Sequence, residues 1–208
     1  MTDLVPALAA APAIAILRSH SPRRFAATAD ALHHAGIRAV EFTLTTPDVL
    51  PALREYAQSR PAELALGAGT VMTPSDATRA VEAGATYLIT PATCLDVIVE
   101  ARRLAVPVLP GALTPSEIVA AWREGATMVK LFPAFIGGPD YLRAVRAPLP
   151  HIPLIPTGGI GLDQAPAYMA AGASALGMGS PLVGDACEGG DLGALRERAA
   201  TLLDGIRS

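Results

Sequence analysis

The chain has 208 residues, of which 51% are hydrophobic and 17% are charged, and its formal net charge is -3. This charge gives no basic footprint for nucleic acid or for an anionic membrane surface. The two cysteines form no motif and are too few for a disulfide scaffold, so a reducing cytoplasm is the expected location.

The first 19 residues are apolar and invite comparison with a targeting segment. No basic residue precedes the apolar part, Pro6 and Pro12 interrupt it, and it is too short to span a bilayer. We therefore expect a short capping segment, followed directly by the first strand.

Eight short apolar runs recur along the chain. They are residues 13–17, 39–44, 64–69, 86–90, 106–110, 127–132, 152–157 and 174–178. Small and β-branched residues fill them, which is typical of parallel strands that are buried on both faces.

Predicted helices separate these strands. They are residues 22–35, 47–59, 74–83, 94–104, 115–124, 139–147, 163–171 and 191–206. Several begin with Ser or Thr followed by Pro, as at 21–22, 46–47, 73–74 and 114–115. In such a pair the hydroxyl caps the helix and the proline takes its first position.

Eight strand–helix units with short connections favour an α/β fold of the (β/α)8 TIM barrel type. We expect residues 1–208 to form this barrel as a single domain. A doubly wound open sheet is the alternative arrangement of the same elements.

The predicted strands have two different faces. In residues 39–44 a bulky apolar face alternates with a small or polar face that includes Glu41. In residues 127–132, Lys130 lies on the face opposite Val129. The period of two places Glu41 and Lys130 on the lumen side of a barrel.

Lys130 is the only lysine in the chain. Burial in a lumen disfavours the ammonium form and lowers its pKa, and a neutral amine can attack a ketone to form an imine. An arginine cannot do this chemistry. Glu41, the only acidic residue in a predicted strand, could transfer protons beside it. The pair is thus a candidate catalytic site, and a purely structural ion pair between the two is the alternative.

Glycines end the last two predicted strands. The seventh ends in Gly158 and Gly159, and the eighth ends in Gly179 and Ser180. Loops at these two places in barrels often bind phosphate through backbone N–H groups, although a simple turn would use the same residues.

Two further polar residues stand at strand ends. Thr70 follows the third strand and could bind a carboxylate, and Arg18 follows the first and could bind an anion. Either could instead be a local cap or a surface residue. The histidines show no ligand spacing, so no metal site is expected. Cys94 and Trp122 are predicted to be packing residues.

Nine short motifs together resemble one enzyme family. They are AILR (15–18), GIRAVEFTLTTP (36–47), GAGTV (67–71), ITP (89–91), LPG (109–111), VKLFPA (129–134), GGPDYL (137–142), PTGGI (156–160) and GMGS (177–180). Over almost its whole length the chain resembles the 2-keto-3-deoxy-6-phosphogluconate (KDPG) and 4-hydroxy-2-oxoglutarate (KHG) aldolases, including phosphogalactonate relatives. The resemblance implies a class I aldolase on a (β/α)8 barrel, commonly a homotrimer, without a metal or other cofactor.

The resemblance also implies roles for single residues. It places the Schiff-base lysine at Lys130, the proton-transferring glutamate at Glu41 and the threonine that holds the pyruvate carboxylate at Thr70. The other positions that match the family's binding pocket are Pro91, Phe132, Gly158, Gly159, Gly179 and Ser180. The implied substrate is a phosphorylated 2-keto acid, cleaved to pyruvate and glyceraldehyde 3-phosphate.

One departure from the family leaves the substrate open. Many phosphogluconate enzymes have an arginine where this chain has Thr45, whereas phosphogalactonate-type members have one at the end of the first strand, as at Arg18. The preferred epimer and the use of 4-hydroxy-2-oxoglutarate are therefore not fixed. Two other functions also fit these motifs, a phosphate-binding barrel isomerase or synthase that forms no imine, and a non-catalytic barrel that senses a phosphorylated metabolite.

Overall fold

The computed structural model describes residues 4–207 and has an α/β architecture. Its strands are β1 (Ala13–Leu17), β2 (Ala39–Thr43), β3 (Ala65–Gly69), β4 (Tyr87–Ile89), β5 (Val108–Leu109), β6 (Gly111–Ala112), β7 (Val129–Leu131), β8 (Leu154–Pro156) and β9 (Leu176–Met178). Its α-helices are α1 (Leu4–Ala10), α2 (Phe25–His34), α3 (Val49–Ser59), α4 (Pro74–Glu82), α5 (Leu95–Arg103), α6 (Pro115–Glu124), α7 (Gly138–Arg146), α8 (Ala165–Ala170), α9 (Ser180–Val183) and α10 (Leu192–Arg207). Short 3-10 helices are η1 (Pro22–Arg24), η2 (Ala134–Ile136) and η3 (Ala186–Glu188).

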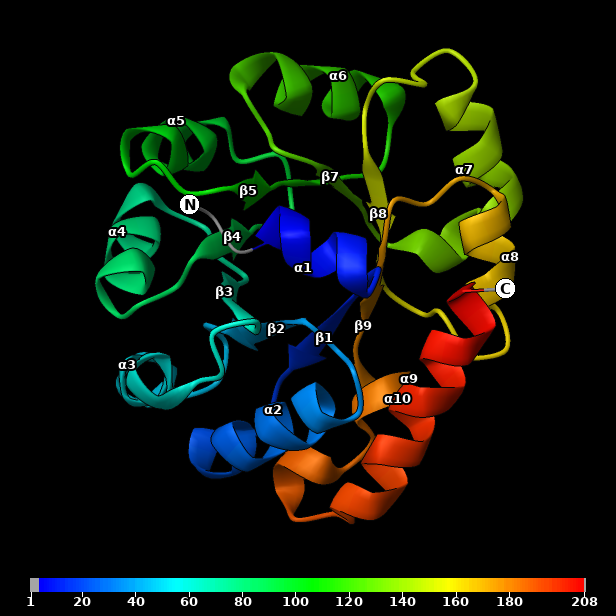
Figure 1. Cartoon of the computed structure of the whole chain (residues 1–208). Coiled ribbons are helices and arrows are strands. Elements are labelled where there is room, and N and C mark those ends of the chain that lie inside the picture. Colours follow the sequence, from blue (N-terminus) through cyan, green and yellow to red (C-terminus); the bar gives the residue numbers. More distant parts are fainter. Residues whose placement is uncertain (1–3, 208) are drawn as a thin grey trace.

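The strands form two parallel sheets. The larger sheet has the order β5-β4-β3-β2-β1-β9, and the smaller has the order β6-β7-β8. An isolated bridge between Thr157 and Gly177 connects the ends of β8 and β9. In Figure 1 the helices other than α1 surround the strands on the outside. The first strand, β1, pairs with the last, β9, which is the neighbour that the barrel prediction expects for it.

The predicted fifth strand, residues 106–110, is not one strand in the structure. β5 pairs with β4, whereas β6, which begins directly after Pro110, pairs with β7. Proline has no backbone N–H to donate to a ladder, so the pairing changes partner at this residue. The other predicted strands are present, and most are shorter at their ends than predicted.

Three of the four predicted Ser/Thr-Pro helix starts are confirmed. Ser21 caps η1, where its hydroxyl accepts a hydrogen bond from the Arg23 N–H and Pro22 takes the first position. Thr73 and Thr114 each form a capping box with the acidic residue three positions later, at the start of α4 and of α6. The predicted start at Thr46 is wrong, because α3 begins at Val49. The Thr46 hydroxyl instead accepts a hydrogen bond from the backbone N–H of Ser19, 3.3 Å away, and so joins the loop after β2 to the loop after β1.

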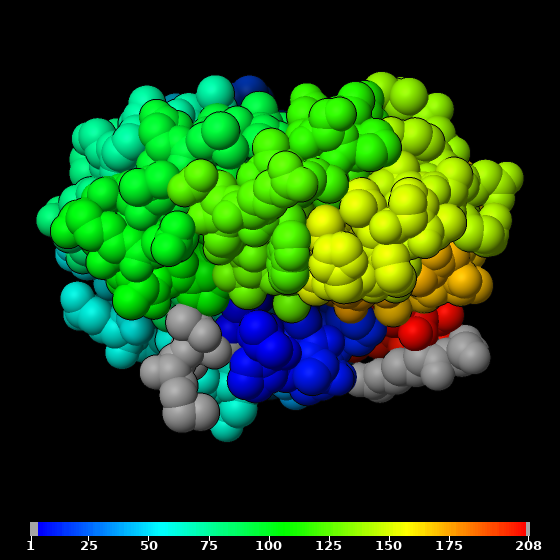
Figure 2. Space-filling model, turned by 90° about the horizontal axis from the view of Figure 1, so that it is seen from above, coloured from blue at the N-terminus to red at the C-terminus, as the bar shows by residue number. Residues whose placement is uncertain are grey.

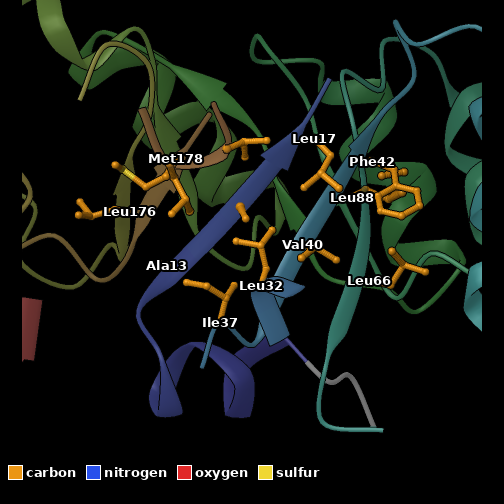
Figure 3. Close-up of a cluster of buried hydrophobic side chains, with 14 of the residues drawn as sticks. Ala13, Leu17, Leu32, Ile37, Val40, Phe42, Leu66, Leu88, Leu176 and Met178 are labelled. Carbon is orange, nitrogen blue, oxygen red and sulfur yellow. The ribbon is translucent and has the colours of Figure 1, made fainter. Parts of the chain in front are cut away.

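The core has two parts, on the two faces of the strands. The larger part lies between strands and helices, and Figure 3 shows some of its side chains along neighbouring strands, among them Leu17, Val40, Phe42, Leu66 and Leu88. Cys94 and Trp122 pack against it partly buried, as predicted. The alternation predicted for β2 is confirmed, since Val40 and Phe42 belong to this part while Ala39 belongs to the other.

The smaller part of the core joins inward-facing strand residues to α1. Leu4, Ala7 and Leu8 of α1 are buried together with residues such as Ile14 and Ala39 from the beginnings of strands. In Figure 1 this helix lies across the centre of the ring of strands, and Figure 2 shows it at one face of the molecule. The expected capping segment is therefore a helix that covers the amino ends of the strands and leaves the carboxyl ends for a site. Within residues 4–207, no helix combines the length and the apolar composition needed to cross a membrane.

Candidate active site

A cavity of about 450 Å³ lies at the carboxyl ends of the strands. It brings together every site residue predicted from the sequence, namely Arg18, Glu41, Thr70, Pro91, Lys130, Phe132, Gly158, Gly159, Gly179 and Ser180. Sequence reasoning missed other residues of the lining, including Ile16, Thr157 and Val183. Ile16 could have been found, because it stands two positions before Arg18, and in an extended chain side chains two positions apart point to the same side.

Lys130 reaches the cavity from the middle of β7. Its neighbours Val129 and Leu131 point into the outer core, so the pleat directs Lys130 inward. The side chain is only 8% exposed, and its Nζ lies 4.8 Å from the centre of the Phe132 ring. Burial lowers the pKa of the amine, against the opposing effect of Glu41, and the positive charge of Arg18 lowers it further. The neutral form that a nucleophile needs is therefore more populated than in a solvent-exposed lysine.

Glu41 enters the same cavity from β2 and is 1% exposed. Burial raises the pKa of its carboxyl group, while Lys130 and Arg18 act in the opposite direction. Its Oε2 atom has no hydrogen-bond partner in the described part of the chain. A buried carboxyl group with a free oxygen at a cavity is suited to giving and taking a proton there.

The two residues do not form a direct ion pair. The ion pairs found among residues 4–207 lie at the surface, as between Arg103 and Glu100, and none brings Lys130 within 4.0 Å of Glu41. The direct ion pair that the structural alternative requires is therefore absent from the described residues. Lys130 and Glu41 instead both line the cavity.

Thr70 stands at the edge of the cavity, directly after β3. Its φ angle is 59°, in the left-handed region that β-branched residues rarely adopt. Such strain is kept where the surrounding structure imposes it, often at binding sites.

The glycine loop after β8 lines another side of the cavity. Its backbone is held by two hydrogen bonds, from the Ala134 N–H to the Thr157 carbonyl at 2.8 Å and from the Phe135 N–H to the Gly158 carbonyl at 3.2 Å. Among the backbone hydrogen bonds of residues 4–207, none uses the N–H groups of Gly158 or Gly159. These donors at the cavity are thus free for an anion.

Comparison with known families decides what this cavity belongs to. Residues 5–197 match the aldolase family described as KDPG and KHG aldolase. The chain belongs to this family. It is therefore an aldolase, a carbon–carbon lyase, and the motifs that resembled the family in the sequence are confirmed as marks of membership.

Individual relatives support the same assignment for this aldolase. A 2-dehydro-3-deoxy-phosphogluconate aldolase from Pseudomonas aeruginosa is 42% identical over 143 residues, which cover 68% of this chain and 64% of that protein, slightly less than two thirds. A probable 2-dehydro-3-deoxy-6-phosphogalactonate aldolase from Rhizobium meliloti is 33% identical over 193 residues, covering 92% of this chain and 90% of that one. The structure of KDPG aldolase from Legionella pneumophila, with pyruvate captured at low pH as a covalent carbinolamine intermediate, is 28% identical, covers 98% of each chain and has a TM-score of 0.86.

The aldolase offers no obvious metal centre in the part of the chain that the structure describes. Within residues 4–207, no three side chains of His, Cys, Asp or Glu gather in a way that could hold a metal ion.

Proposed function

We propose that the enzyme cleaves a 2-keto-3-deoxy-6-phospho sugar acid to pyruvate and D-glyceraldehyde 3-phosphate through a Schiff base on Lys130. The observation that carries the proposal is a buried amine with a lowered pKa beside a buried carboxyl group with a raised one, in one cavity of an enzyme of this family. The Legionella relative, in which pyruvate forms a covalent carbinolamine, supports the same chemistry.

The reaction begins with imine formation. The neutral Nζ of Lys130 attacks the C2 ketone of the substrate and forms a carbinolamine. Glu41 gives a proton to the departing hydroxyl group, which leaves as water, and the nitrogen becomes a protonated imine. This cation withdraws electrons and so weakens the C3–C4 bond of the substrate.

Carbon–carbon cleavage then uses the same two residues. The Glu41 carboxylate takes the proton from the C4 hydroxyl group, the C3–C4 bond breaks, and its electron pair moves into the imine to give an enamine. Glyceraldehyde 3-phosphate departs as the aldehyde. Protonation of the enamine at C3 and addition of water then release pyruvate and return Lys130 to the free amine.

The polar residues of the rim are assigned to the two ends of the substrate. We assign the carboxylate end to Thr70 and Arg18. The phosphate end is assigned to the backbone of Gly158, Gly159, Gly179 and Ser180, because all four residues line the cavity and no backbone hydrogen bond found among residues 4–207 uses the N–H of Gly158 or Gly159. Pro91 and Phe132 form apolar walls between these ends.

The fold-level expectations belong to the same proposal. Residues 1–208 form one domain, and the two sheets close into a single (β/α)8 barrel. Closure is supported by the continuous chain from β5 to β6 and by the bridge between Thr157 and Gly177. A homotrimer in the cytoplasm remains the prediction for the assembled enzyme. A structurally similar chain that serves as a module in a cage built from symmetric oligomeric domains supports self-association.

Covalent trapping tests the mechanism. Incubation with pyruvate and then borohydride should inactivate the enzyme with one adduct per chain, located on the segment from Met128 to Phe132. The Lys130→Arg variant should fold but lose both adduct and activity, because a guanidinium group stays protonated and forms no imine. The only other primary amine, at Met1, lies outside the described residues and is predicted to be far from the cavity.

Borohydride without pyruvate is the control, and it should leave activity unchanged. An active preparation that acquires no adduct would refute the Schiff base and leave Lys130 and Glu41 acting only as acid and base. A preparation that binds phosphorylated metabolites but cleaves no keto acid would favour the sensor alternative.

A further inference from the structure

Strand β3 has no side chain where Glu41 lies against it. A Cβ atom added at Gly69 would stand 1.4 Å from the Glu41 Oε1 atom, 2.1 Å from its Cδ and 2.6 Å from its Cγ. The backbone of Gly69 is not in the left-handed region, so its φ angle does not require glycine. The space is what requires it, because the Glu41 carboxyl group occupies the place of a side chain at position 69.

The other inward-facing glycine of β3 has a different neighbour. A Cβ atom at Gly67 would lie 2.3 Å from the ring of Tyr87. That tyrosine is fully buried, and its hydroxyl group donates a 2.7 Å hydrogen bond to the carbonyl of Val40. The two glycines therefore make β3 a flat surface on which the side chains of Tyr87 and Glu41 lie, one beside each glycine.

We propose that Gly69 is a positioning residue of the aldolase, whose missing side chain holds the Glu41 carboxyl group at the depth and place where it transfers protons. The inference rests on the proposed role of Glu41 and adds to it the element that fixes its position. Any larger residue at 69 must drive the carboxyl group away from β3. The added Cβ atom would meet the carboxyl group of Glu41 itself. The substitution therefore displaces the group that transfers the proton.

The electrostatic surroundings of Glu41 turn this displacement into a measurable change. The charged and titratable groups that act on it come from three other elements: Lys130 of β7, Arg18 after β1 and Tyr87 of β4. Burial is the main cause of the raised pKa of Glu41, and the two cations oppose it. A carboxyl group pushed toward the cavity is less buried, so its pKa should fall.

The test is the Gly69→Ala variant, examined by steady-state kinetics and by exchange of the pyruvate methyl protons in heavy water. We expect turnover and methyl exchange to fall by at least about tenfold, since misplacing a catalytic group by an ångström can cost about 100-fold. The limb of the pH–rate profile that reports Glu41 should move to lower pH. KM for the phosphorylated substrate should stay within about twofold of wild type, because the residues assigned to the carboxylate and the phosphate are untouched. Pyruvate should still be trapped on Lys130, though more slowly, because Glu41 also assists the loss of water from the carbinolamine. Unchanged turnover and an unchanged pH profile would overturn the proposal.

Gly67→Ala is the matched control on the same strand. Its methyl group meets the Tyr87 ring instead of the carboxyl group, so it should lower stability without moving the pH–rate profile. A remote control is Gly205→Ala on α10, where the added methyl group lies at an ordinary 3.4 Å from Pro166. If Gly67→Ala shifts the pH profile as much as Gly69→Ala does, the effect belongs to the strand as a whole and the proposal is wrong.

A stability cycle covers the case in which Gly69→Ala does not fold. The same substitution in a Glu41→Ala background should be tolerated, because the atoms that the methyl group meets are gone. Loss of folding in both backgrounds would show that the space serves something other than Glu41. Failure of the proposed function gives a different result, since normal turnover of Glu41→Gln refutes the role of Glu41 whatever position 69 does.

Discussion

Replacing Glu41 by Gln removes the ability of the side chain to give and take a proton and changes its shape very little. The amide has nearly the same shape as the carboxyl group, so it fits the space beside Gly69 that a longer or branched side chain would overfill. Glu41 makes no ion pair with Lys130 within 4.0 Å that the amide would break. The substitution thus separates proton transfer from packing.

Turnover of Glu41→Gln should fall by about 100-fold or more, the lower end of the range for losing a positioned acid or base. A 100-fold loss corresponds to about 2.7 kcal/mol of transition-state stabilisation. Lys130 remains in place, so trapping with pyruvate and borohydride should still label the variant, though more slowly. The assay is aldol cleavage coupled to reduction of the released pyruvate, with labelling measured on the same preparation.

Stability should respond in the opposite direction to activity. The pKa of Glu41 is raised in the folded protein, chiefly by burial. A raised pKa stabilises the fold at pH values below the unfolded pKa, near 4.3, and this contribution is lost as pH rises through the folded pKa. Gln cannot ionise. The free energy of unfolding of the variant, relative to wild type, should therefore improve as pH rises above about 4.3. Near-normal turnover would refute the role of Glu41, and a large loss of stability at pH 7 would show that its charge is structural after all.

Two further predictions concern the substrate. In Gly159→Leu the Cβ atom would lie 2.7 Å from Phe135, at a backbone φ of 71°. KM should therefore rise far more for phosphorylated substrate than for a short unphosphorylated 2-keto acid. Equal effects on both substrates would indicate general misfolding. Because Thr45 replaces an arginine found in many phosphogluconate enzymes and Arg18 lines the cavity, both the gluconate and the galactonate epimers should be cleaved at measurable rates. A preference of about 1000-fold for the gluconate epimer, or roughly 4 kcal/mol, measured as a ratio of kcat/KM, would contradict this.

The sequence was informative wherever a local rule decided the structure. The period of two placed Glu41 and Lys130 on the inward faces of their strands, and a Thr-Pro pair predicted the start of α4. The same reasoning failed at Thr46, because a contact with Ser19, distant in sequence, competes for its hydroxyl group. It also failed at Pro110, where partner exchange depends on which strand lies on each side.

The role proposed for Gly69 could not be read from the sequence for a related reason. In sequence, the glycines of residues 67–69 look like a turn or a weak strand. Their role depends on which side chains of the neighbouring strands lie over them, and the register of strand pairing decides this. β2 and β3 pair with Glu41 opposite Gly67 and Thr43 opposite Gly69, so the long Glu41 side chain crosses to the next glycine along. When a glycine makes room for a side chain of a neighbouring strand, the residues next to it in sequence do not show this.

Burial acts on Lys130 and Glu41 in a way that suits one step in particular. For both groups burial is the largest cause of the shift, lowering the pKa of the amine and raising that of the acid. Each charge would stabilise the other, but the two groups lie farther apart than an ion pair, so this attraction offsets only part of the cost of burial. Burial thus shifts both groups toward their neutral forms, which in the proposed mechanism attack the ketone and release water from the carbinolamine. Arg18 lowers the pKa of both groups, and so favours the amine as a nucleophile and the carboxylate as the base for the next step.

A second lysine in this lumen would add a competing amine, and an arginine in place of Lys130 would supply charge without a nucleophile. An isolated lysine among arginines is what this division of roles requires.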